Sequence, residues 1–181
     1  MTTPRRDVVD AVHAALLPHA DPVRAAGQQR YMKSRMPYLG LTSPTLRATL
    51  RPVLGDTAYR IADRSGWEAT VRALWDEATH REHWYAALTL LQHRRYGAWR
   101  DPELRPLVRH LVVTGAWWDV VDELATHVVR GLLLGWPETM APVLRTWACD
   151  DHLWVRRCAM LAQVAAVSGA LLLAALGCFL V

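Results

Sequence analysis

The chain has 181 residues, of which 52% are hydrophobic and 21% are charged, so it is not a disordered protein and can bury one domain-sized core. Its formal charge of +4 favours an anionic partner such as nucleic acid. Lys33 is the single lysine among 21 basic residues, and the guanidinium groups of the others suit phosphate contacts.

The three cysteines include no CxxC pair, which argues against a disulfide framework and a structural zinc site. We expect a cytoplasmic protein, because the first residues also lack the apolar core of a signal peptide.

The first half of the chain contains two clear helical patterns. Apolar residues recur at helical spacing over residues 7–17, and Asp21-Pro22 is expected to begin a connection. A basic stretch, residues 30–35, leads into a turn. Ser43 can then cap a helix that has Pro44 at its first position and ends before Pro52.

Six further amphipathic segments follow, each separated from the next by a short polar, Gly or Pro break. They are Trp67–Glu77, Arg81–Arg95, Pro102–Val113, Ala116–Leu134, Pro137–Ala148 and Asp151–Gln163. No useful length of the chain alternates with period two, so the sequence predicts an all-α protein.

A faint internal repeat indicates how these helices are arranged. Residues 87–92 are echoed by residues 158–163, about two periods of a HEAT-type unit later. Antiparallel helix pairs stacked side by side would give a curved solenoid with a concave face. We therefore predict a HEAT-like solenoid domain over residues 1–163.

Residues 164–181 form an apolar tail. No charged residue follows Arg157, and a stretch of about 20 apolar residues is long enough to span a bilayer. Arg156 and Arg157 would then be a positive-inside anchor. The alternative is a buried terminal helix broken at Gly169 and Gly177, as a truncated or frame-shifted reading frame would produce. We favour this alternative, because the segment begins inside an amphipathic helix that the domain needs.

The most informative stretch is residues 114–122. Trp118 and Asp122 are four residues apart, so in a helix they share one face, with an indole beside a carboxylate. The opposite stripe is apolar and consists of Trp117, Val121, Leu124 and Val128. On spacing alone, a lone Trp near an Asp is more often a packing residue or part of a cap, and Asp122 could be a solvated residue or cap partner.

Three blocks of the sequence, residues 30–44, 117–122 and 151–157, resemble in order and separation the AlkD-like family of DNA alkylation repair glycosylases. The resemblance implies a HEAT-like solenoid whose concave surface holds duplex DNA. It also implies hydrolysis of the N-glycosidic bond of cationic N3- or N7-alkylated purines. The family has a further Trp and more helices beyond the third block, and here the sequence departs from it.

The resemblance also implies roles for individual residues. Trp118, Asp122 and Arg157 match the family's catalytic positions, and Tyr31 matches an aromatic residue near the DNA. We expect the basic residues Lys33, Arg35 and Arg156 to bind DNA as well. On spacing alone, Arg157 beside Arg156 could instead be a surface charge.

The sequence therefore predicts a monomeric DNA glycosylase that acts on alkylated double-stranded DNA without metal or cofactor and initiates base excision repair. His80 and His83 are three residues apart, but no third metal ligand is evident. Two other functions stay open: a non-catalytic HEAT-repeat scaffold that binds DNA without excising a base, and a tail-anchored helical protein.

Overall fold

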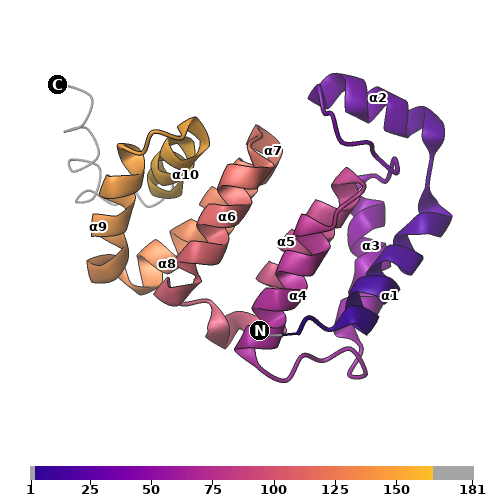
Figure 1. Ribbon diagram of the computed structural model, residues 1–181, viewed down its shortest axis with the longest axis horizontal. Coiled ribbons are helices and arrows are strands. Elements are labelled where there is room, and N and C mark those ends of the chain that lie inside the picture. Colours follow the sequence, from indigo (N-terminus) through magenta and orange to yellow (C-terminus); the bar gives the residue numbers. More distant parts are fainter. Residues whose placement is uncertain (1–2, 165–181) are drawn as a thin grey trace. The chain divides into compact units, whose positions relative to one another are not determined.

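The computed structural model describes residues 3–164, and every regular element in that range is a helix (Figure 1). The predicted all-α class is therefore confirmed. The predicted tail lies outside the described residues from position 165 onward. Among the residues described, no helix is both long and apolar enough to cross a membrane. The chain forms two compact units, Met1–Tyr96 and Gly97–Val181.

The first unit packs helices around a core that contains two fully buried tryptophans, Trp67 and Trp75. Helix α1 packs against α3 and α4, and α4 packs against α5, which lies beside it in Figure 1. The elements are α1 (Arg6–Leu16), η1 (Leu17–His19), α2 (Pro22–Met32), α3 (Ser43–Gly55), α4 (Arg64–Asp76) and α5 (Arg81–Gln92), and the short helix η2 (Arg94–Trp99) crosses the unit boundary.

Two expectations for this unit were wrong. Asp21-Pro22 begins α2 rather than a connection: the Asp21 side chain accepts a hydrogen bond from the backbone N–H of Arg24, and Pro22 takes the first helical position.

Helix α3 is capped by Thr42 instead of Ser43, and it continues through Pro52 to Gly55. Because its buried face runs on to Leu54, packing outweighs the hydrogen bond that a proline removes.

A buried carboxylate fixes the segment between α2 and α3. Both oxygens of Glu82, which is 1% exposed, accept backbone N–H groups: Leu39 at 2.8 Å, Gly40 at 2.8 Å and Leu41 at 3.1 Å. These three donors compensate for burying the charge. Gly40 has φ +94°, and a Cβ atom there would lie 2.2 Å from the carbonyl oxygen of Asp21. Glycine is therefore required at this position.

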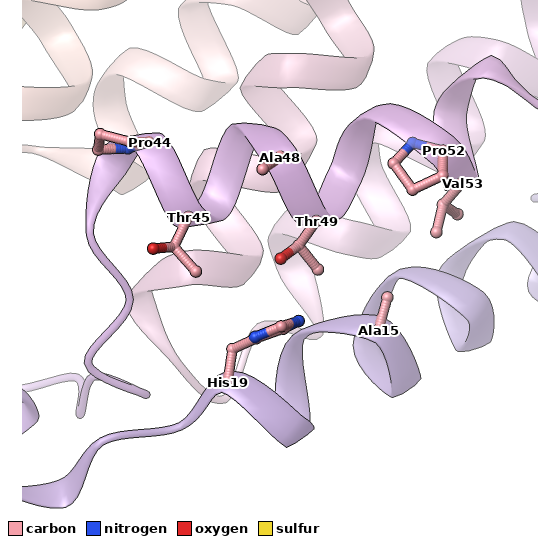
Figure 2. Close-up of a pocket in the computed structure, with 8 residues that line it drawn as sticks. All are labelled: Ala15, His19, Pro44, Thr45, Ala48, Thr49, Pro52 and Val53. Carbon is pink, nitrogen blue, oxygen red and sulfur yellow. The ribbon is translucent and has the colours of Figure 1, made fainter.

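An open groove runs between α3 and the end of α1, as Figure 2 shows. Most of its lining is apolar, with His19 from η1 and two threonines of α3 as its polar members. None of the residues proposed above for catalysis or DNA binding lines it. The lining residues are Ala15, His19, Pro44, Thr45, Ala48, Thr49, Pro52 and Val53.

The second unit packs α10 against α6, α7 and α9. The long helix predicted over Ala116–Leu134 is divided into an α-helical start, a π-helical middle and an α-helical end. The echo in the sequence corresponds to α5 and α10, each the later member of a packed pair, α4 with α5 and α9 with α10. The elements are η3 (Pro102–Leu104), α6 (Arg105–Gly115), α7 (Trp118–Glu123), the π-helix η4 (Leu124–Val129), α8 (Arg130–Gly135), α9 (Pro137–Ala148) and α10 (Leu153–Val164).

Histidines gather in the first unit where α1 meets the start of α5. The rings of His13 and His83 stack with centroids 3.9 Å apart, and the ring of His80 lies 5.6 Å from that of His83. Burial, aided by the two neighbouring histidines, lowers the pKa of His83 to about 4. Burial also lowers the pKa of His13, although Asp10 and Glu77 act in the opposite direction. Within residues 3–164, no group of three or more His, Cys, Asp or Glu side chains could hold a metal ion.

These histidines should make the fold acid-sensitive between pH about 6.5 and about 4. In this window the unfolded chain binds a proton at His83 that the folded chain does not, so the free energy of unfolding falls as the pH falls. The contribution of one histidine is at most about 1.4 kcal/mol per pH unit. Urea unfolding at a series of pH values should show a shallower dependence for His83→Gln than for the parent. The control is His127→Gln, which removes an exposed histidine instead of a buried one. Equal slopes of the free energy of unfolding against pH for the parent and His83→Gln would contradict the assignment.

Candidate active site

The turn before α7 sets the direction of the two adjacent tryptophans. Helix α6 ends at Gly115, and Ala116 follows in the left-handed region with φ 35°. Trp117 is then extended and precedes the helix, while Trp118 is its first residue. The prediction that Trp117 belongs to the apolar helical stripe was therefore wrong, because the reversal of the chain requires an extended residue there. The other predicted members of the stripe, Val121, Leu124 and Val128, are buried.

Trp118 and Asp122 lie on the exposed face of α7. The Trp118 side chain is 42% exposed, and the Asp122 side chain is 34% exposed. Their spacing of four residues within one helix places them one turn apart. Neither residue belongs to the buried core.

Arg157 of α10 pairs with Asp122 through two parallel hydrogen bonds. Its Nε donates to Oδ1 at 2.7 Å and its Nη2 donates to Oδ2 at 2.6 Å. These bonds raise the pKa of Arg157, so the guanidinium stays charged. The structure thus brings together three residues that the sequence separates by up to 39 positions, Trp118, Asp122 and Arg157.

Two residues around Asp122 were missed by sequence reasoning. The Thr126 hydroxyl donates to the backbone carbonyl oxygen of Asp122 at 2.7 Å, within the π-helical turn that follows α7. Such turns are frequent at functional sites.

Cys158, next to Arg157, is fully buried, and burial together with the charge of Asp122 raises the pKa of its thiol to about 12. Cys158 is therefore a neutral thiol, and only its position after Arg157 could have indicated it.

Arg156 turns away from this pair and fixes the start of α10. Its Nη1 donates to the carbonyl oxygens of Asp150 at 2.7 Å and Asp151 at 3.0 Å. Arg109 of α6 pairs with the Asp150 carboxylate at 2.8 Å and, with the backbone N–H of His152, lowers the pKa of that carboxyl. These contacts hold the first turn of the helix that carries Arg157.

A pair of tryptophans makes a second contact between the α7 region and α10. The ring of Trp154 lies 5.9 Å from that of Trp117, centroid to centroid, with 47° between the planes. Both side chains are half-buried. Trp154 precedes Arg157 on α10 by three residues, so one side of α10 supplies both contacts to the α7 region.

The remaining predicted residues, Tyr31, Lys33 and Arg35, belong to the first unit. All three are exposed, Tyr31 at 77%. Lys33 ends α2 in the left-handed conformation, with φ 50°, and its backbone N–H donates to the carbonyl oxygens of Arg30 and Gln29. The structure therefore presents an aromatic ring and two cations to solvent at the end of α2.

The arrangement at α7 and α10 leaves hydrogen-bonding capacity on both members of the ion pair. A carboxylate has about four lone-pair sites and a guanidinium has five N–H donors, and the two bonds between Asp122 and Arg157 use two of each. Asp122 can still stabilise a cation or orient a water molecule. Within residues 3–164, Nη1 of Arg157 makes no hydrogen bond, so it can still bind an anion together with the second N–H of Nη2.

Comparison with known proteins gives one result that bears on this geometry. A family model described as DNA alkylation repair enzyme matches residues 12–174, which is most of the chain and includes all the candidate site residues. No curated protein matches the chain.

Because the ion pair faces solvent, Asp122→Asn should cost the fold little. Partly exposed pairs typically contribute about 1 kcal/mol or less to the free energy of unfolding. Leu124→Ala, two residues further on and fully buried, should cost about 2–5 kcal/mol. Urea unfolding of both variants measures the difference, and equal losses would contradict a solvent-facing position for Asp122.

Proposed function

Because the chain belongs to the DNA alkylation repair enzyme family, we propose that it is a monofunctional DNA glycosylase that initiates base excision repair. Its substrates would be purines alkylated at N3 or N7 in duplex DNA, and its reaction the hydrolysis of their N-glycosidic bond. The observation that supports this proposal most directly is the bidentate pair of Asp122 and Arg157 beside the exposed indole of Trp118.

The chemistry needs little help at the base. An N3- or N7-alkylated purine carries a positive charge, so it leaves as a neutral base when it takes the electron pair of the C1′–N bond. The difficult part is the deoxyribose, which develops oxocarbenium character as that bond breaks. Water then attacks C1′ and forms the C1′–O bond, and its proton passes to the solvent. An enzyme for this reaction therefore needs negative charge near C1′ and a group that orients water.

Asp122 is suited to both tasks. Its carboxylate is held by Arg157 through two hydrogen bonds, and the lone pairs that the guanidinium leaves free can face the sugar or hold the attacking water. The Thr126 hydroxyl bonds to the backbone of Asp122 and leaves the carboxylate unobstructed. A fixed carboxylate is effective here because its orientation does not have to be established during the reaction.

Trp118 offers a π face to the same cationic unit. Contact between a cation and an indole contributes about 0.5–2 kcal/mol, depending on desolvation. Because Trp118 is 42% exposed, its ring is accessible to a sugar and base without rearrangement of the core.

Arg157 can bind DNA without releasing Asp122. Its Nε and Nη2 hold the carboxylate, and the end of the guanidinium, with one N–H each from Nη1 and Nη2, can bind a backbone phosphate bidentately. A phosphate bound in this way lies at a fixed position relative to Asp122, so the guanidinium sets the register of the strand. Tyr31, Lys33 and Arg35 would supply further contacts to DNA, and Arg156 would contribute charge while it anchors α10.

Asp122→Asn should lower the release of 7-methylguanine from methylated duplex DNA by about 100-fold or more, because the amide lacks the charge that stabilises the sugar cation. Affinity for the duplex should change by only a few-fold, since Arg157 and the other cations remain. Single-turnover release of free base and a binding titration at fixed salt measure the two quantities.

Glu138→Gln is the matched control, because Glu138 is an exposed acid of α9 in the same unit and should not affect release. Parent-like activity of Asp122→Asn would reject the role of the carboxylate. Salt-sensitive DNA binding by the parent without any base release would identify a DNA-binding scaffold instead of a glycosylase.

A further inference from the structure

The α7 region, from Trp117 to Asp122, and the first turns of α10 meet in two side-chain contacts. One is the ring contact between Trp117 and Trp154, and the other is the ion pair between Asp122 and Arg157. Each helix region contributes one residue to each contact. The two contacts therefore form one seam, with indoles at its beginning and charges further along.

The ion pair alone is a weak determinant of this geometry. Exposed pairs between long side chains contribute little, because holding them in one conformation costs side-chain entropy. Two bonds of 2.6–2.7 Å nevertheless require the guanidinium and the carboxylate to be nearly coplanar. The pair therefore depends on how the packing between α7 and α10 separates the two backbones.

Trp154 has the properties of a spacer between the two backbones. Its large rigid ring packs on Trp117, the residue that directly precedes α7, and it lies one helical turn before Arg157. The indole nitrogen of Trp117 is buried and, within residues 3–164, has no hydrogen-bond partner. The contact thus works through shape and packing area rather than through a hydrogen bond.

We propose that Trp154 is a positioning residue for the proposed glycosylase reaction. Its ring, packed on Trp117, holds α10 at the distance from α7 at which Arg157 binds Asp122 with two N–H groups. This inference rests on the proposed function. Loss of the ring would let Arg157 bind through one bond or move away, which misplaces both the carboxylate and the phosphate contact.

Trp154→Ala should lower the single-turnover rate of 7-methylguanine release at least about tenfold at saturating enzyme, because small misplacements of reacting groups are costly. Affinity for unmodified duplex should stay within about threefold, since the cations remain. Trp154→Phe, which keeps a ring, should restore the rate to within about threefold of the parent. In an Asp122→Asn background, Trp154→Ala should have no further effect.

The control is Trp147→Ala, which removes a buried indole from α9 of the same unit but not from the seam. It separates the proposal from a general loss of stability. At a temperature where all variants are folded, its rate should match that of the parent. A loss as large as that of Trp154→Ala, or a parent-like rate for Trp154→Ala, would overturn the proposal.

A second measurement does not depend on activity. The Nε–H resonance of Arg157, assigned by its disappearance in Arg157→Lys, should be protected from exchange with solvent in the parent and in Trp154→Phe, and unprotected in Trp154→Ala. Equal protection in all three proteins would refute the positioning role even if the parent released no base. Protection as expected, without base release, would instead retain the seam and reject the glycosylase assignment.

Discussion

The bidentate pairing of Asp122 with Arg157 is the constraint on which the candidate site depends. It orients a carboxylate on the exposed face of α7, where a single acid would adopt several side-chain conformations. It also leaves the outer edge of the guanidinium available for a phosphate. In the proposed reaction, the same two residues would therefore stabilise charge and position the strand, and Trp118, one turn away, would offer its ring to the cation.

Hydrogen bonds and an ion pair hold the backbone near both members of the pair. The first turn of α10 is fixed through Arg156, and Arg109 from α6 holds the Asp150 carboxylate. The π-helical turn after α7 places the Thr126 hydroxyl on the carbonyl of Asp122. The contacts of Arg156, Arg109 and Thr126 lie at or near helix ends. The buried faces of α6, η4 and α10 pack together as the core of this unit.

Much of this could be read from the sequence. Apolar periodicity predicted the helical class, and the interval of four residues correctly predicted that Trp118 and Asp122 share one helical face. The missed features depend on interactions that no local pattern records. Helix α2 was missed although Asp21-Pro22 is a regular start signal, because the low hydrophobicity of the helix weakened the periodic pattern. Trp117 was assigned to the wrong face because the left-handed turn at Ala116, a residue with no preference for it, cannot be read from local sequence.

The contact between Asp122 and Arg157 also depends on tertiary structure, since 35 positions of the sequence separate the two residues. A double-mutant cycle on the rate of 7-methylguanine release tests most directly whether they act as one unit. We predict that Arg157→Lys lowers the rate of release in the parent but lowers it little or not at all in the Asp122→Asn enzyme, because both changes disrupt the same interaction between carboxylate and guanidinium. Two independent effects that simply multiply in the double variant would contradict the account.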